Sequence, residues 1–115
     1  MYQKIFIVGN LGKDPEMAYT PDGKARTTFS VATSERKDKT AWFRVTAWER
    51  TAEIVNQYAK KGQRVLVEGR LEFDAETGGP RVYQKKDGSW AASFEVSASV
   101  VKLLGKSEVD DEPVY

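Results

Sequence analysis

Apolar and polar residues alternate with a period of two in several segments of this chain, and a single segment has the period of an amphipathic helix. In residues 27–33, for example, Phe29 and Val31 fall on one side and Thr28 and Ser30 on the other. Successive side chains of a β-strand point to opposite faces, so each alternating segment predicts a strand with one buried face. The chain is therefore expected to form an all-β domain.

Five strands and one helix account for the apolar pattern. In the helical segment, Ile54, Val55, Tyr58 and Ala59 form one apolar face, and Gly62 is the residue expected just after the last turn. The strands are expected at residues 5–8, 27–33, 41–48, 63–73 and 94–100, and the helix at residues 51–61. With the helix between the third and fourth strands, this order predicts the five-stranded Greek-key barrel of the oligonucleotide/oligosaccharide-binding (OB) fold.

Glycines divide these segments. Gly9-Asn10, Pro21-Asp22-Gly23 and Asp87-Gly88 each predict a turn, and the last of these closes a small hairpin within the long excursion of residues 74–92. Gly69 predicts a bend inside the fourth strand. The residues expected on the core-facing sides of the last two strands are Val65, Val67, Leu71 and Phe73, followed by Phe94, Val96, Ala98 and Val100.

The net charge of +1 hides an uneven distribution. Of 18 Lys and Arg, 17 precede Gly105, as do 13 of the 17 Asp and Glu, so residues 1–104 carry +4 and residues 105–115 carry −3. We expect one folded domain over residues 1–105 and a short, acidic, disordered tail over residues 106–115. A basic body favours a polyanionic partner, for whose surface an acidic tail can compete.

Cysteine and histidine, which carry much of enzyme chemistry, are both absent from the sequence. The chain therefore has no thiolate nucleophile, no disulfide and no imidazole base, and it lacks the common phosphate-binding and dinucleotide-binding glycine patterns. We expect neither an enzyme nor a bound metal or cofactor. The start of the chain does not have the features of a signal peptide, and no apolar stretch approaches the roughly 18 residues that span a bilayer, so a cytoplasmic protein with no membrane contact is expected.

Residues 40–50, TAWFRVTAWER, place three large aromatic side chains and an arginine in one expected strand. The odd-numbered residues of this strand are apolar and suit the core, which leaves Trp42, Arg44 and Trp48 facing solvent. Six residues at a rise of about 3.3 Å separate the two indoles by roughly 20 Å, which spans several nucleotides. An exposed indole favours association, and a nucleobase can cover it, because stacking contributes about 1–3 kcal/mol per base without reading sequence. The alternative is that the helix or a partner chain buries this face.

Further basic and aromatic residues extend this candidate surface. They lie in the loop before the third strand, on the outward face of the fourth strand and on the expected hairpin, and they are Arg36, Lys37, Lys39, Arg64, Arg70, Arg81, Tyr83, Lys85, Lys86 and Trp90. Basic residues interleaved with aromatic ones are typical of surfaces that bind single-stranded nucleic acid. A merely solvated surface is the simpler interpretation of such a loop, and Glu72, Asp74 and Glu76 would repel phosphate at the base of the hairpin.

Several ordered blocks of the sequence resemble the bacterial single-stranded DNA-binding proteins. The blocks are FIVGNLGKDPE, FSVATSE, WFRVTAWERTAE, YAKKGQRVLVEGRLE and FEVSASVVKLLG, and the resemblance extends from Tyr2 to about Gly105. It implies an OB-fold barrel that binds and protects single-stranded DNA during replication, recombination and repair, on the nucleoid and without sequence preference. It also assigns stacking positions to Trp42, Trp48 and Tyr83, the last through its spacing from Arg81 and Gly88.

The sequence departs from the family pattern in four places. Arg36 and Lys37 stand where the family commonly has a further tryptophan, AETGGP lengthens the approach to the hairpin, and no long Gly/Pro/Gln-rich linker is present. The last residues, DDEPVY, differ from the family's acidic tip, which ends in Pro-Phe. The resemblance implies that this tip recruits replication and repair proteins, whereas the alternative is a solubilising tail. The tip residues are Asp110, Asp111, Glu112, Pro113, Val114 and Tyr115.

The family usually assembles as a homotetramer, so the resemblance implies that residues 2–8 pair with the same strand of a second copy. A short apolar edge strand is consistent with such pairing. Two other functions remain open. An RNA-binding barrel would share the fold and the stacking chemistry, since nothing in the strands reads a 2′-hydroxyl. A protein-interaction module would use the same aromatic side chains against another chain.

Overall fold

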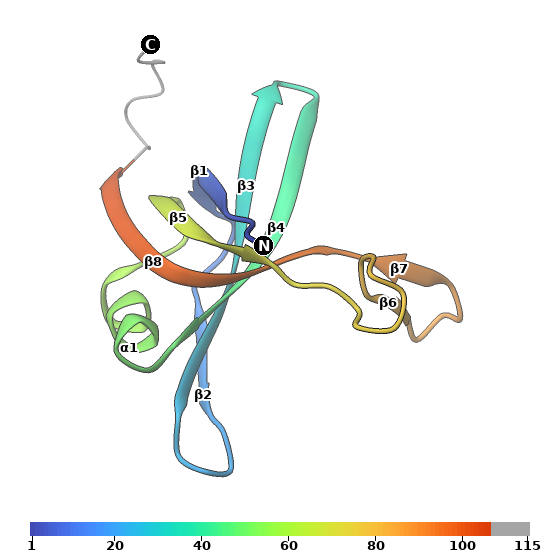
Figure 1. Cartoon of the computed structure of the whole chain (residues 1–115). Coiled ribbons are helices and arrows are strands. Elements are labelled where there is room, and N and C mark those ends of the chain that lie inside the picture. The colour runs from blue at the N-terminus through green and yellow to red at the C-terminus, as the bar shows by residue number, and fades with distance from the viewer. Residues whose placement is uncertain (107–115) are drawn as a thin grey trace.

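The computed structural model describes residues 1–106, in which eight strands and one helix follow one another along the chain (Figure 1). The elements are β1 (Ile5–Leu11), β2 (Glu16–Tyr19), β3 (Ala25–Arg36), β4 (Lys39–Trp48), α1 (Glu49–Tyr58), β5 (Gln63–Leu71), β6 (Val82–Gln84), β7 (Trp90–Ala92) and β8 (Phe94–Lys106). The five expected strands correspond to β1, β3, β4, β5 and β8, and the expected small hairpin corresponds to β6 and β7.

Five of these strands close into a barrel. The sheet order is β1-β5-β8-β4-β3-β2, and pairing of β1 with β3 through Asn10–Ala32 and Leu11–Val31 closes the ring. Neighbouring strands are antiparallel except β4 and β8, which run parallel. The expected OB-fold barrel, with its helix between the third and fourth barrel strands, is confirmed.

Valines fill the interior of the barrel. Val31, Val45, Val65, Val67 and Val96 are at most 1% exposed and come from four of the five barrel strands. Branched side chains of this kind have few rotamers to lose and pack well on a pleated surface. Alternate residues of the same strands therefore point outward, and these outward residues make up the surface of the barrel.

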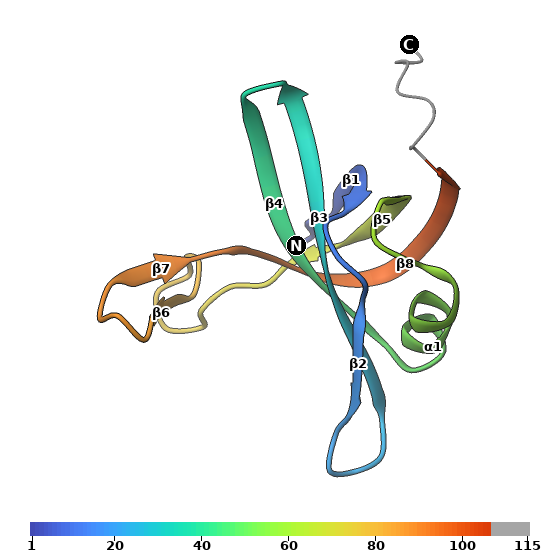
Figure 2. The ribbon, with the colours of Figure 1, turned by 180° about the vertical axis from the view of Figure 1, so that it is seen from behind.

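Helix α1 closes one end of the barrel, and both views place it beside the lower part of β8 (Figures 1 and 2). Its buried residues are Ala52 and Val55, and the buried Thr27 hydroxyl on β3 donates a hydrogen bond of 2.8 Å to the Ala52 carbonyl. Ile54 and Tyr58, which were expected on the buried face, are 38% and 59% exposed. The small Ala52 faces β3 in their place because a bulkier residue would hold the helix away from the strand. No helix in the described residues could cross a membrane.

The helix also begins and ends earlier than expected. It runs from Glu49 to Tyr58, and Ala59 is already extended, with ψ 143°. Gly62, which was expected immediately after the helix, instead lies in a separate turn with φ 87°. In that turn the Gln63 N–H donates a hydrogen bond of 2.9 Å to the Lys60 carbonyl.

The N-terminal part of the chain holds more strand than the sequence pattern indicated. β1 continues through the expected turn at Gly9-Asn10, so that prediction was wrong. A Cβ atom on Gly9 would lie 2.2 Å from the Ala32 carbonyl oxygen, and this glycine therefore permits the close approach of β1 and β3 that closes the barrel. β2, where no strand was expected, pairs with β3 from Glu16–Thr28 to Tyr19–Ala25. The expected turn at Gly23 joins them and is confirmed, with φ 87°.

A bulge changes which residues of β8 point into the barrel. The register between β5 and β8 changes between Glu68–Val100 and Gly69–Ala98, which confirms the expected irregularity at Gly69. A Cβ atom on Gly69 would lie 2.1 Å from the Ser97 carbonyl oxygen. Beyond the bulge, Val101 and Leu103 pack against the core, so the expected core position of Val100 was wrong.

The chain leaves the barrel after β5 and returns at β8. Leu71 and Phe73, which were expected in the core, are 41% and 53% exposed because they lie where the chain departs. We call residues 72–93 the arm, and both views show it extending away from the barrel (Figures 1 and 2). Strands β6 and β7 pair with each other and contact no other strand of the described chain. The expected turn at Gly88 is confirmed, with φ 90°.

Candidate nucleic-acid interface

The outward face of β4 carries the two tryptophans. Val45 and Ala47 are fully buried, whereas Trp42 and Trp48 are 51% and 39% exposed and Arg44 is exposed as well. The alternation expected from the sequence therefore holds over this strand. Helix α1 does not bury this face, because it packs against the opposite, inward side of the sheet at the end of the barrel.

Trp42 lies in a row of outward residues that runs round the barrel. It pairs in register with Ala32, which pairs with Asn10, which in turn pairs with Arg64. The half-buried Arg64 donates a hydrogen bond of 3.2 Å from Nε to the Asn10 side-chain oxygen. The structure thus places Arg64 on the Trp42 side of the barrel, three strand spacings away, or about 14 Å along the surface.

The back of the Trp42 indole rests on the loop after β1. A Cβ atom on Gly12 would lie 2.6 Å from Cζ3 of Trp42 and 2.8 Å from its Cη2. The ring therefore occupies the space that a side chain at position 12 would need. Gly12 did not enter the sequence-based candidates, because its role depends on a contact across 30 positions of sequence.

Arg44 borders a small polar pocket of about 170 Å³. Lys13 lines the same pocket from the loop after β1, so two cations lie near each other beside Trp42. Asp14 also lines it, and the Asp14 carboxylate accepts a hydrogen bond of 2.8 Å from the Lys61 N–H. Lys13 was not among the sequence-based candidates.

Trp48 borders a larger groove of about 310 Å³. Arg26, which pairs with Trp48 across β3 and β4, lines this groove and was missed from the sequence. Arg81 enters from the arm, and its guanidinium lies 3.4 Å from a carboxylate oxygen of Glu72 and 3.4 Å from one of Glu95. The structure thus brings the Arg81 side chain beside Trp48, already paired with two carboxylates.

The two aromatic residues of the arm hairpin point in opposite directions. Tyr83 pairs in register with Ala91, whereas Trp90 pairs with Gln84, so the two rings lie on opposite faces of the two-stranded ribbon. Both are well exposed, at 47% and 68%. One face of this ribbon can therefore present only one of the two rings to a given ligand. Lys85 and Lys86 are exposed at the tip.

Basic residues at the loop between β3 and β4 form ion pairs with acidic neighbours. Arg36 lies 3.4 Å from Asp38, and Lys39 lies 2.9 Å from Glu35, while Lys37 is exposed. At the arm turn, hydrogen bonds from Ser89 lower the pKa of Asp87. On the N-terminal segment, a hydrogen bond to Glu68 raises the pKa of Lys4 above its ordinary value. The loop cations are thus partly neutralised before any ligand arrives.

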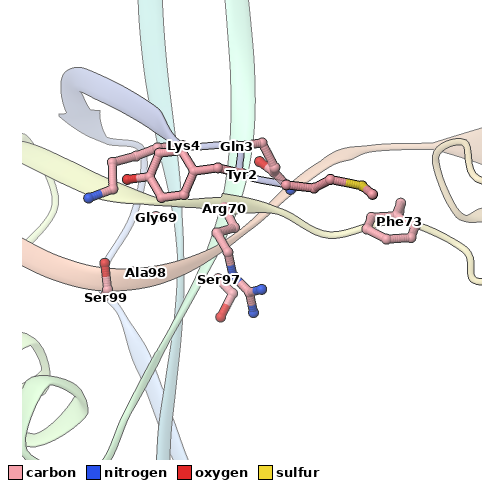
Figure 3. Close-up of a pocket in the computed structure, with 10 residues that line it drawn as sticks. Tyr2, Gln3, Lys4, Gly69, Arg70, Phe73, Ser97, Ala98 and Ser99 are labelled. Carbon is pink, nitrogen blue, oxygen red and sulfur yellow. The ribbon is translucent and has the colours of Figure 1, made fainter.

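Arg70 lies outward on β5, at the opposite end from Arg64. It pairs in register with Ser97 on β8, and Ser97 pairs with Thr46 on β4, so all three share the outward face that carries Trp48. Arg70 lines an open pocket of about 660 Å³ beside the N-terminal segment (Figure 3). Residues 1–106 contain no group of three side chains suited to holding a metal ion. The tip residues Asp110 to Tyr115 lie outside the described residues.

The closed five-stranded barrel and its exposed tryptophan and arginine side chains define an OB-fold binding protein. Comparison with known proteins narrows this class. Residues 2–104 match the Single-strand binding protein family, and the chain belongs to that family.

Individual relatives carry consistent names. A single-stranded DNA-binding protein of Neisseria meningitidis serogroup A is 40% identical, over 89% of this chain and 59% of the relative. Proteins with the same name from Xanthomonas campestris and Wolinella succinogenes are 39% and 35% identical, over 89% and 100% of this chain and 60% and 76% of those relatives. The chain thus spans about three-fifths of the length of the first of these relatives.

Proposed function

We propose that this chain binds single-stranded DNA without reading its sequence, and protects it during replication, recombination and repair. The observation that carries the proposal is the outward face of β4, where Trp42, Arg44 and Trp48 are exposed while the inward Val45 and Ala47 are fully buried. Unpaired bases can stack on the two indoles, and arginine can pair with phosphate. A duplex keeps its bases stacked inside, so this surface favours single strands.

The other cations of the surface differ in whether they already pair with a carboxylate. Lys13, Arg26 and Arg70 lie on or beside the barrel face that carries the tryptophans, where they can contact phosphate directly. Arg36, Lys39 and Arg81 already pair with carboxylates and must exchange partners to do so. The relatives are named for single-stranded DNA, which favours DNA over RNA as the ligand.

A titration with oligo(dT) of increasing length tests the proposal. Tryptophan fluorescence should fall as bases cover the indoles, and the affinity should exceed that for oligo(U) at the same salt concentration. An RNA-binding barrel would prefer oligo(U) or bind both equally. A protein-interaction module would show no quenching with either, and that result would reject nucleic-acid binding.

We further propose assembly as a homotetramer through β1. In the described residues, β1 pairs with β3 only at Asn10 and Leu11, which leaves the edge from Ile5 to Val8 open to another strand. Tyr2, Phe6 and Val8 are 81%, 64% and 55% exposed along this segment. An open edge with an apolar face favours pairing with a second copy. Measurement of mass in solution tests this, and a monomeric mass at micromolar concentration would reject it.

For the acidic tip, we propose recruitment of replication and repair proteins, with the protein acting on the nucleoid in the cytoplasm. Support comes from the composition of the tip, an acidic cluster followed by proline and an aromatic residue. A peptide with the sequence DDEPVY should compete with the whole chain for such partners. If a peptide with the same residues in scrambled order competes equally well, the recruitment is not specific.

A further inference from the structure

The open pocket beside the N-terminal segment lies on the same side of the barrel as Trp48. Residues 1–4 form one wall, and β5 and β8 form the other (Figure 3). Gln3 holds the segment in place: its side-chain amide donates to the Leu71 carbonyl and accepts from the Leu71 N–H, both at 3.1 Å. This amide continues the ladder between β1 and β5, and the pocket is therefore built into the fold.

The pocket and the Trp48 groove share a residue. Ser97 lines both of them, and it lies in register between Arg70 on one side and Thr46 on the other. Two strand spacings separate Arg70 from Thr46, which amounts to about 10 Å. A strand of nucleic acid that leaves Trp48 across β8 therefore meets Arg70 next.

The residues beyond Ser97 have the chemistry of a nucleotide subsite. Arg70 is exposed and takes part in no ion pair among the described residues, in contrast to Arg81 and Arg36. Phe73 lines the same pocket with its ring 53% exposed. Figure 3 shows the Arg70 side chain extending toward Ser97. The same view shows Phe73 at the end of the pocket nearest the arm. The nearby Lys4 and Glu68 neutralise each other at 2.6 Å, so Arg70 is the charged side chain of the pocket lining that has no ion pair among the described residues.

We propose that Arg70 and Phe73 form an additional subsite for one nucleotide of the bound single strand, with the phosphate at Arg70 and the base on Phe73. This inference rests on the proposed function. It extends the path of the bound single strand from β4 across β8. A pocket of this size accommodates a ligand as large as a nucleotide. Alternation along the strand predicted that Phe73 lies in the core. Phe73 is exposed because the chain leaves the barrel at this point, and the proposed subsite depends on that departure.

The test compares Phe73→Ala and Arg70→Ala with the unchanged chain over a series of oligo(dT) lengths. Short oligonucleotides that cover only β4 should bind the variants as tightly as the unchanged chain. Longer ones should bind Phe73→Ala about 5- to 150-fold more weakly, the equivalent of one lost stacking contact. Phe73→Tyr should retain the affinity and Phe73→Leu should not, because stacking needs the ring.

Tyr58→Ala is the matched control, since Tyr58 is 59% exposed on α1 at the end of the barrel. Thermal unfolding and mass in solution are measured for every variant. Equal affinity of Phe73→Ala and the unchanged chain at all lengths overturns the subsite while leaving the proposed function intact. A change of mass in Phe73→Ala also overturns it, because the pocket would then belong to an interface between copies. Failure of the unchanged chain to bind any oligonucleotide overturns the proposed function itself.

Discussion

Trp48 lies at the end of β4, where the outward face of the strand meets the groove that Arg26 and Arg81 also line. Its indole is 39% exposed, so one part of the ring packs on the barrel and the other part is available to a base. Trp42, six residues earlier, is held from behind by the backbone at Gly12. At the scale of single residues, the site thus consists of rings with one fixed and one open side.

Replacement of Trp48 by alanine should weaken oligo(dT) binding by about 1–3 kcal/mol, because one stacking contact is lost. Stability should change little, since the ring is partly exposed. An equilibrium binding assay measures the effect on affinity, and thermal unfolding measures the effect on stability. Tyr58→Ala serves as control and should bind normally; an unchanged affinity of Trp48→Ala would contradict the stacking role.

Replacement of Gly12 by alanine should displace the Trp42 ring. The new Cβ would lie 2.6 Å from the nearest ring atom, and the exposed indole can swing away more easily than the loop can move. In a background with Trp48 and Trp90 changed to phenylalanine, the emission of Trp42 should shift and its quenching by oligo(dT) should decrease. Gly105→Ala, where a Cβ meets nothing within 4 Å, should leave both unchanged.

Among the elements, β4 and the arm contribute differently. β4 is a barrel strand whose outward residues are fixed by the pairing on both of its edges. The arm contacts no barrel strand through β6 or β7, and Arg81 connects it to the barrel through Glu95 on β8 while also pairing with Glu72 at the base of the arm. Distances of 3.4 Å and partial exposure make these pairs weak, worth about 0–1 kcal/mol in general, so phosphate can displace them.

The combined change Glu72→Gln and Glu95→Gln should therefore tighten binding. Arg81 would be free for phosphate, and two charges that repel DNA would be gone. The dependence of log affinity on log salt should steepen by about 0.7 if one phosphate contact is added. Glu53→Gln on α1 is the control. Weaker binding by the double variant would instead show that the carboxylates mainly hold the arm in its binding position.

For the whole molecule, the distribution of charge matters more than its sum. Residues 107–115 hold Glu108, Asp110, Asp111 and Glu112 and no lysine or arginine, while the preceding residues are basic. We expect an acidic segment attached to a basic binding surface to compete with DNA at high effective concentration. This competition is electrostatic, so it weakens as salt screens the charges.

Deletion of residues 107–115 should tighten oligo(dT) binding at low salt and have little effect at high salt. Replacement of the four acidic residues by their amides should reproduce the effect, because the charge and not the length of the segment is responsible. Binding isotherms at two salt concentrations measure this. Equal affinity of the deleted and complete chains at low salt would contradict competition by the tail.

The sequence alone determined the features that depend on near neighbours. Period-two alternation identified four of the five barrel strands and a short apolar run identified the first. The alternation also turned Trp42, Arg44 and Trp48 outward, because the direction of a side chain along a strand depends only on its position. The helix was located to within a few residues for the same kind of reason. Its buried face was misjudged, since that face depends on how closely β3 approaches.

Tertiary structure decided the features that depend on strand register and on where the chain leaves the barrel. The bulge between β5 and β8 moved the core position from Val100 to Val101, and the departure of the chain after β5 exposed Phe73. Pairing in β6 and β7 set Tyr83 and Trp90 on opposite faces, and folding joined Arg81 to Glu72 and Glu95. Each of these features depends on how segments of the folded chain are aligned with one another, and local periodicity does not contain that alignment.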